Sequence, residues 1–280
     1  MPGLVPGIHV VPSTPSDVDG RDKPGHDDVE RDERKTTVVK YDGVRGNSLA
    51  TIACPRAPRT HLVLGWLIFS LSTEPAMSDR STHWQTVYTT KAETEVSWYQ
   101  DEPAMSLRLI RDAGAGASSR IIDIGGGASR LVDALLTAGY GALTVLDISE
   151  AALAAARARL GAAAATVDWI AADVTRWTPQ ASYDVWHDRA AFHFLTDAND
   201  RAAYVARLRA AVAPGGAVII GTFALDGPEK CSGLPVVRYD AESLAATLGP
   251  DFGLQDSCTE AHRTPWGSVQ QFQFCRFRAG

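Results

Sequence analysis

The chain has 280 residues, of which 45% are hydrophobic and 8% aromatic, as is usual for a globular protein with a buried core. Its formal net charge of −6 and the lack of a clustered basic segment argue against nucleic acid as a partner. The four cysteines form no CxxC pair and have no histidine at ligand spacing, which argues against a zinc site and a disulfide framework. We therefore expect no metal ion and a reducing, cytoplasmic location.

Residues 1–76 differ from the rest of the chain. They show no sustained helical or strand period, proline and glycine recur, and charges cluster over residues 21–35. Such a segment buries too little apolar surface to offset its ordering entropy, so we expect a disordered extension, or a spurious one if translation begins at Met77. The apolar run over residues 62–71 is too short to span a bilayer and lies far from the start for a signal peptide, so we expect no membrane association.

Strand-like and helix-like segments alternate from residue 77 onward. The apolar pattern predicts helices over residues 103–113, 130–138 and 150–160, and strands over residues 120–124, 142–147 and 167–171. Further along, it predicts strands over residues 183–187 and 217–223, with a helix over residues 201–212 between them and another over residues 240–248.

Two strands, over residues 252–260 and 267–277, close the chain with no helix between them, which predicts an antiparallel pair. The alternation as a whole predicts an α/β fold with one domain over residues 77–280. We expect a doubly wound, mostly parallel seven-stranded sheet that binds ligands at the carboxyl ends of its strands.

The segment IIDIGGGASR, residues 121–130, is predicted as a strand, a glycine-rich turn and the start of a helix. Gly125 and Gly127 fit the first two positions of a dinucleotide loop, but Arg130 stands where the third glycine belongs. Asp123, ahead of the glycines, would repel a pyrophosphate and suits a cationic ligand. The pattern therefore favours a positively charged nucleoside over a dinucleotide.

Two more acids follow the next two predicted strands. Asp147 ends the second strand, where a carboxylate can accept both hydroxyls of a ribose, and Ile148 is assigned to the same site. Asp173 follows the third strand and is placed to accept from an adenine amino group, with Val174 offering its backbone N–H. Taken singly, Asp147 could instead cap the following helix and Asp173 could be a solvated loop residue. Three acids at three consecutive strand ends favour one common site.

Together these motifs resemble the class I S-adenosylmethionine-dependent methyltransferases over about residues 84–277, including the PGG before the fifth strand. The resemblance implies a Rossmann-like sheet and S-adenosyl-L-methionine as cofactor. It also implies that Asp123, Gly125 and Gly127 form the methionine-side loop, with Asp147 as the ribose acid and Asp173 as the adenine acid. Many relatives carry a larger residue at Gly126, so we expect a looser loop here.

The segment after the fourth predicted strand supplies candidates for the methyl acceptor site. Its DRAAF run, residues 188–192, with the tyrosine and PGG that follow, resembles the thiopurine and thiol S-methyltransferases, although Ala190 replaces a glycine. His187 and Asp188 are candidate catalytic residues that could orient or deprotonate an acceptor; the alternative is a loop network that holds the next helix. Arg189 could pair with a carboxylate of the acceptor.

Aromatic residues are dense ahead of the first strand. Trp84, Tyr88 and Trp98 could form a lid that excludes water and faces the sulfonium charge, or could pack on the sheet. Cys231 lies in a loop after the fifth strand, where a thiol could contact a soft acceptor or be a bystander.

The sequence thus predicts an enzyme that methylates a small-molecule acceptor by in-line displacement, with a thiol or other soft nucleophile favoured. The EVSWYQ segment also resembles a branch with methyltransferases that act on protein lysines, so a protein lysine methyltransferase is the enzymatic alternative. A non-catalytic cofactor-binding protein is the other alternative.

Overall fold

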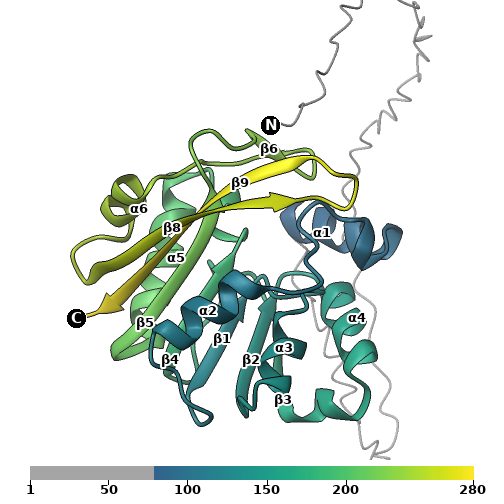
Figure 1. Ribbon diagram of the computed structural model, residues 1–280, viewed down its shortest axis with the longest axis horizontal. Helices are drawn as coiled ribbons and strands as arrows, with labels where there is room; N and C mark the ends of the chain where they lie inside the picture. Colours follow the sequence, from purple (N-terminus) through teal and green to yellow (C-terminus); the bar gives the residue numbers. More distant parts are fainter. Residues whose placement is uncertain (1–78) are drawn as a thin grey trace, which may run out of the picture. The chain divides into compact units, whose positions relative to one another are not determined.

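One seven-stranded sheet organises the chain in the computed structural model, which describes residues 79–280 (Figure 1). The strand order is β3-β2-β1-β4-β5-β9-β8; the first five strands run parallel, and β9 pairs antiparallel with both β5 and β8. The predicted fold class is confirmed, including the antiparallel pair that closes the chain. The extension expected over residues 1–76 lies outside the described residues.

The elements have the following bounds. The strands are β1 (Arg120–Ile124), β2 (Ala142–Asp147), β3 (Val167–Ala171), β4 (Tyr183–Arg189), β5 (Val212–Phe223), β8 (Phe252–Arg263) and β9 (Val269–Ala279), with β6 (Lys230–Cys231) and β7 (Leu234–Pro235) as a small separate pair. The helices are α1 (Asp79–Thr90), α2 (Ala104–Asp112), α3 (Leu131–Thr137), α4 (Glu150–Leu160), α5 (Ala198–Ala211) and α6 (Ala241–Leu248), with short 3-10 helices η1 (Glu93–Glu95), η2 (Gly161–Thr166) and η3 (Phe192–Phe194).

Two hydrophobic cores lie on opposite faces of the sheet because successive side chains of a strand point to opposite sides. In β1, Ile121 packs with α2, α3 and α4, whereas Ile122 and Ile124 pack with α5 and α6. Figure 1 shows these two helix layers on either side of the strands. All the ligand-facing ends of the parallel strands therefore meet at one edge, between the two layers.

Several boundaries differ from the sequence prediction, and two of them are explained by contacts at the ends of these elements. Strand β4 continues past His187, because Asp188 and Arg189 still pair with β5, opposite Ile220 and Gly221. Both residues therefore belong to the strand and not to the loop after it. Helix α5 begins at Ala198 because the Asp197 side chain caps it, accepting from the second and third backbone N–H groups that follow.

Helix α1 was not predicted, because its sequence DRSTHWQTVYTT has no apolar stripe and buries only Val87. The segment after it, through residue 100, lies along β8, where the carbonyl of Ser97 contacts Nε2 of His262 at 2.8 Å and Gln100 donates to Glu260.

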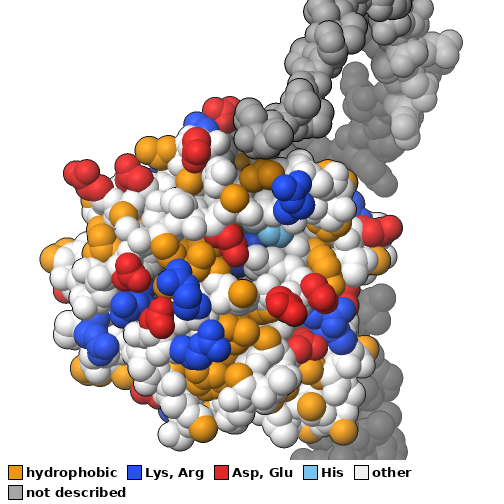
Figure 2. Space-filling view, in the orientation of Figure 1, with side chains coloured by type: hydrophobic (Ala, Val, Ile, Leu, Met, Phe, Trp, Pro, Cys, Tyr) orange, Lys and Arg blue, Asp and Glu red, His pale blue; other side chains and the backbone are white. Residues whose placement is uncertain are grey.

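Acidic and basic side chains are interspersed over the face drawn in Figure 2, with hydrophobic ones between them. Within residues 79–280, no helix is long and apolar enough to cross a membrane.

Candidate functional site

A glycine-rich turn joins β1 to α3 at the ligand-binding edge of the sheet. Gly125 has a φ of +67°, which favours glycine, and a Cβ there would lie 2.7 Å from Cβ of Ala191. A Cβ on Gly127 would lie 2.5 Å from Oδ2 of Asp147. The turn therefore packs directly against the end of β2, and the missing side chains keep this edge open.

Gly126 does not loosen the turn, contrary to the sequence expectation. A Cβ on Gly126 would lie 2.4 Å from Oδ2 of Asp123 and 2.9 Å from Cγ1 of Val145. Asp123 is buried, and its other oxygen, Oδ1, contacts His187, so this carboxylate cannot move aside for a larger residue. The glycine therefore lets the turn pack closely against Asp123.

Asp123 and His187 form a buried polar chain behind the turn. They lie opposite each other in β1 and β4, and Oδ1 of Asp123 is 2.7 Å from Nδ1 of His187. The other ring nitrogen, Nε2, is 2.9 Å from Oγ of Ser106 in α2. Both nitrogens of His187 are thus engaged inside the protein.

Asp147 ends β2 and is 5% exposed. Its Oδ1 accepts from the backbone N–H of Ser149 at 2.8 Å, and it is Ser149, not Asp147, that caps α4. Burial raises the pKa of Asp147 to about 7, against the lowering effect of backbone N–H donors, and the charge of Asp123 raises it further.

Asp173 follows β3 in a tight turn. Its Oδ1 accepts from the backbone N–H and the hydroxyl of Thr175, at 2.9 and 2.7 Å. Its Oδ2 pairs with Nη2 of Arg80 at 3.0 Å, and Arg80 also reaches Asp200 at 3.1 Å. Arg80 therefore ties α1 to the end of β3 and to the first turn of α5.

Two adjoining pockets open at this edge. The first contains about 760 Å³ of empty space and the second about 550 Å³, including the open solvent at their mouths. Four residues line both pockets and mark where they join: Tyr88, Trp98, Gly125 and Arg189.

The first pocket brings together most of the predicted site residues. Its lining includes Gly125, Asp147, Ile148, Asp173 and Val174 from the nucleotide prediction and Trp84, Tyr88, Trp98, Arg189 and Cys231 from the acceptor prediction. The second pocket runs beside the glycine turn and contains Asp123, Ser129, Arg130 and His187. Gly127 lies in neither lining but packs on Asp147.

An aromatic cluster forms one wall of the first pocket. The ring of Trp84, from α1, lies 5.6 Å from that of Trp98 and 4.9 Å from that of Phe194, both edge to face. Tyr88 lies 6.2 Å from Trp98, and burial raises the pKa of its hydroxyl well above the usual value. The rings therefore pack on one another while still lining the pocket. The two roles that the sequence left open, a lid over the site and packing within the protein, are not exclusive.

Asp188 does not line either pocket. It is fully buried, and it accepts from the backbone N–H groups of Ala191 and Phe192 and from the hydroxyl of Tyr204 at 2.7 Å. Burial raises its pKa to about 6. These contacts hold the turn after β4 in place, in which Ala190 adopts a φ of +69°; that left-handed backbone explains why a glycine suits this position.

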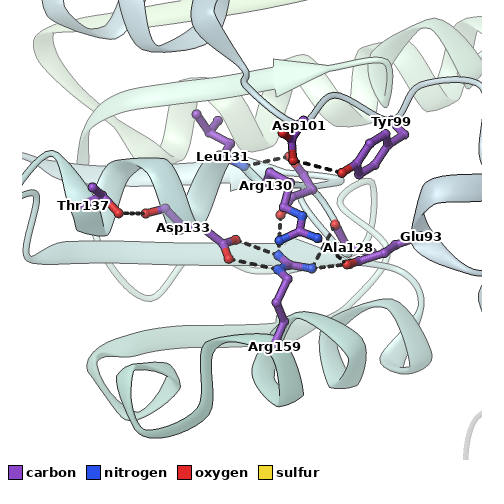
Figure 3. A network of polar contacts seen from close by, with 10 residues as sticks. Glu93, Tyr99, Asp101, Ala128, Arg130, Leu131, Asp133, Thr137 and Arg159 are labelled. Carbon is purple, nitrogen blue, oxygen red and sulfur yellow. Dashed lines mark hydrogen bonds and ion pairs between the residues drawn. The ribbon is translucent and has the colours of Figure 1, made fainter. Parts of the chain in front are cut away.

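Arg159 of α4 stabilises the glycine turn through hydrogen bonds and ion pairs (Figure 3). Its guanidinium donates to the carbonyl oxygens of Ala128 and Ser129 and forms ion pairs with Asp133 and Glu93. Glu93 also pairs with Arg130 at 2.9 Å, so η1 is joined both to the start of α3 and to α4.

Cys231 is a buried thiol in the lining of the first pocket. Its Sγ lies 3.9 Å from Oγ of Ser97, and burial raises its pKa to about 11. It is therefore a neutral thiol at physiological pH. Among the described residues, no group of three His, Cys, Asp or Glu side chains could hold a metal ion.

Comparisons with known proteins fit this architecture. Residues 121–216 match a family model described as a methyltransferase domain. No curated protein sequence matches the chain.

Several solved structures share the fold. One is the N-methyltransferase NodS from Bradyrhizobium japonicum WM9 in complex with S-adenosyl-L-homocysteine, with 18% identity, a TM-score of 0.55, and coverage of 72% of this chain and 99% of that one. Another is the 1,6-didemethyltoxoflavin N1-methyltransferase of Burkholderia thailandensis, with 21% identity, a TM-score of 0.54, and coverage of 71% and 87%. A third is a methyltransferase from Anabaena variabilis, with 16% identity, a TM-score of 0.58, and coverage of 72% and 96%.

The family match covers the glycine turn, the three acids and the PGG segment. Residues 121–216 are therefore similar to a methyltransferase domain, and the fold is the one shared by the solved methyltransferases described above.

Proposed function

We propose that this enzyme methylates a small molecule whose nucleophilic atom reaches the site already deprotonated, as a thiolate or a comparable anion. The observation that carries the proposal is the state of the titratable groups where the two pockets meet. Among the described residues, each candidate for a general base there is either engaged within the protein or held in the wrong protonation state.

The residues present fit the donor. Asp147 offers a buried carboxylate to the ribose hydroxyls. Ile148, Ala172 and Val174 offer an apolar surface to the adenine ring. The second pocket offers Asp123 to the amino group and Arg130 to the carboxylate of the methionine part. Nε of Arg130 is buried without a hydrogen-bond partner in the described residues, as expected of a group that awaits an anionic ligand.

Neither predicted catalytic residue is placed to take a proton from an acceptor. Both ring nitrogens of His187 are occupied, by Asp123 and Ser106, and Asp188 is turned into the core. We infer that both are positioning residues: His187 orients the acid beneath the glycine turn, and Asp188 shapes the turn after β4.

The other two candidates are neutral. Burial keeps Tyr88 and Cys231 protonated at physiological pH, since it raises the pKa of both groups. A protonated phenol or thiol cannot act as a base, but either can contact an acceptor.

Bound S-adenosylmethionine would supply an activated methyl group on its sulfonium sulfur, and this methyl group would pass to the acceptor by in-line displacement. The chain's own contribution is then to align donor and acceptor and to exclude water. Trp84, Trp98 and Phe194 close the first pocket with apolar faces, which also suit the sulfonium charge. A thiol acceptor needs little help from a base because a free thiol is partly ionised near neutrality.

A protein lysine is less well suited to this pocket. Its ammonium group would have to lose a proton to a base, and Arg189 in the lining disfavours a second positive charge. A non-catalytic role predicts donor binding without methyl transfer to any acceptor.

Donor binding is tested by calorimetry with S-adenosylhomocysteine. Asp147→Ala should abolish binding, because it removes the carboxylate that would hold both ribose hydroxyls. Asp168→Ala is the matched control, since Asp168 is an exposed acid on the neighbouring strand β3. Equal affinity in the two variants would refute the donor site.

Acceptor class is tested with methyl-labelled donor and separate sets of small thiols, small carboxylates, small amines and extracted protein. We expect transfer to thiols or other anions and none to amines. Transfer to a single protein band would select the lysine alternative, and tight donor binding without any transfer would select the non-catalytic one.

A further inference from the structure

Arg189 presents an unused edge of its guanidinium inside the site. Nε and Nη2 are buried without a hydrogen-bond partner in the described residues, while Nη1 donates to the carbonyl of Trp98 at 3.0 Å. The side chain is 11% exposed and lines both pockets where they join. Since buried polar groups are nearly always satisfied in folded proteins, this edge indicates a missing partner.

The guanidinium is held in one orientation. Its Cζ lies 4.5 Å above the ring of Phe272 in β9, and the bond to Trp98 fixes the opposite side. Glu260 of β8 comes within 4.0 Å of Nη2, but its carboxylate oxygens accept from Gln100 at 3.2 and 3.3 Å. The acid nearby therefore offsets part of the charge without using the free N–H groups.

We propose that the free edge of Arg189 binds a carboxylate of the methyl acceptor, so that the substrate is a small carboxylic acid. Nε and Nη2 are adjacent donors in a rigid plane, which matches the two oxygens of a carboxylate. This assignment rests on the proposed function, because it names the substrate class of that same site.

The position of Arg189 in the sheet separates it from the donor. The donor acids stand at the ends of β1, β2 and β3, and Arg189 ends β4, the next strand beyond β1. Its neighbours Cys231, Glu260 and Phe272 all come from the carboxyl-terminal part of the chain. Arg130, at the glycine turn, is the arginine available to the donor's own carboxylate.

A charged acceptor also suits a pocket without a base. Burial lowers the pKa of Arg189 to about 10, which still leaves it cationic at neutral pH. The carboxylate stays ionised throughout, and the nucleophile's electron pair forms the new bond to the methyl carbon. The carbon–sulfur bond electrons return to sulfur, which leaves neutral S-adenosylhomocysteine.

The test is calorimetric titration of the enzyme saturated with S-adenosylhomocysteine. The probes are acetate, benzoate and succinate, each compared with its amide. We expect at least one acid to bind at low millimolar concentration and its amide to bind about 10- to 100-fold more weakly. Arg189→Met should remove this preference, and Arg189→Lys should keep part of it, because lysine retains the charge but loses the planar pair of donors.

Three results would overturn the inference. Acids and amides that bind equally, or no binding of any acid, would show that the edge of Arg189 does not read a carboxylate. A loss of S-adenosylhomocysteine affinity in Arg189→Met, in place of the loss of acid binding, would assign Arg189 to the donor. Failure of the wild-type enzyme to bind S-adenosylhomocysteine would refute the proposed function itself, which keeps the two failures distinct.

Discussion

Asp123 and His187 face each other across adjacent parallel strands, with 2.7 Å between Oδ1 and Nδ1, and both are nearly fully buried. The contact places an imidazole directly behind the acid that the glycine turn covers. His187 is anchored in turn by Ser106 of α2. The acid that we propose for the amino group of the donor is thus oriented by a ring that is itself fixed on its other side.

Replacement of His187 should lower the unfolding free energy and weaken donor binding, without removing a proton-transfer step. His187→Leu leaves the buried carboxylate of Asp123 without its partner. We therefore expect a loss of about 1–3 kcal/mol in unfolding free energy, together with weaker S-adenosylhomocysteine binding. His187→Asn can still donate to Asp123 and should lose less of both. Urea unfolding and calorimetry measure the two effects.

The pH dependence of kcat separates this positioning role from a catalytic one. We expect His187→Asn to keep the shape of the wild-type profile. A drop in kcat of about 10²-fold or more with unchanged donor affinity and unchanged stability would identify His187 as a general base instead.

Tyr204 should stabilise the turn after β4 through Asp188. Its hydroxyl donates to Asp188 at 2.7 Å and accepts from Nε1 of Trp186 at 2.8 Å. Tyr204→Phe leaves both partners unsatisfied in the core and should cost about 1–3 kcal/mol in urea unfolding. Tyr183→Phe is the matched control: its ring is buried in the same core, and its hydroxyl makes no hydrogen bond in the described chain.

The deficit of Tyr204→Phe should depend on pH. The hydroxyl favours the ionised form of Asp188, whose pKa is raised by burial to about 6. Its loss therefore matters more above pH 6, where the carboxylate is charged, than at pH 5, where it is protonated. An equal deficit at pH 5 and pH 8 would contradict this account of the network.

Asp147 should make donor affinity depend on pH near neutrality. Burial raises its pKa to about 7 in the free protein, whereas ribose hydroxyls that donate to the carboxylate favour the charged form. Binding must therefore expel a proton below pH 7, and affinity for S-adenosylhomocysteine should fall by up to about tenfold per pH unit below that point. Above pH 8 it should be level. Asp147→Asn has no such proton to lose, so any residual binding should show no step near pH 7.

The sequence was sufficient for the sheet and for the acids at its strand ends. β1 and β2 are short, mainly apolar strands that are buried at nearly every position, and β3 is a short, partly exposed edge strand with an apolar end. Asp147 and Asp173 follow directly from the ends of these strands. The same logic placed the β4 boundary too early, because Asp188 and Arg189 are charged residues that the strand nevertheless carries into the site.

Side-chain contacts between different helices and strands could not be predicted from the sequence. The pairing of Asp123 with His187 depends on the register of β1 against β4, which no local pattern encodes. Arg80 and Phe194 line the first pocket without a motif to mark them. Arg159 has the pattern of a surface residue in an alanine-rich helix, yet it binds two carbonyl groups of the glycine turn.

Glu93 connects the segment before β1 to the glycine turn that we propose for the donor. Its carboxylate pairs with Arg130 at the start of α3 and with Arg159 beneath the glycine turn (Figure 3). The residues around it, from α1 to residue 100, supply Trp84, Tyr88 and Trp98 to the pocket wall. Two ion pairs that are only about one-quarter exposed or less therefore hold a wall of the site in place.

Glu93→Gln should loosen that wall and speed release of the donor product. The amide keeps the shape but loses the charge that two arginines share, so we expect S-adenosylhomocysteine to dissociate about 3- to 10-fold faster in stopped-flow displacement. Glu150→Gln is the matched control, because within residues 79–280 Glu150 pairs only with Arg157, on the surface of α4, and is 55% exposed. If the two variants released S-adenosylhomocysteine at the same rate, the ion pairs of Glu93 would have no part in retaining it. A faster release in Glu93→Gln alone would show that the ion pairs of Glu93 help to retain S-adenosylhomocysteine, through the wall that they hold or through Arg130, since this substitution touches neither the ribose acid nor the aromatic wall.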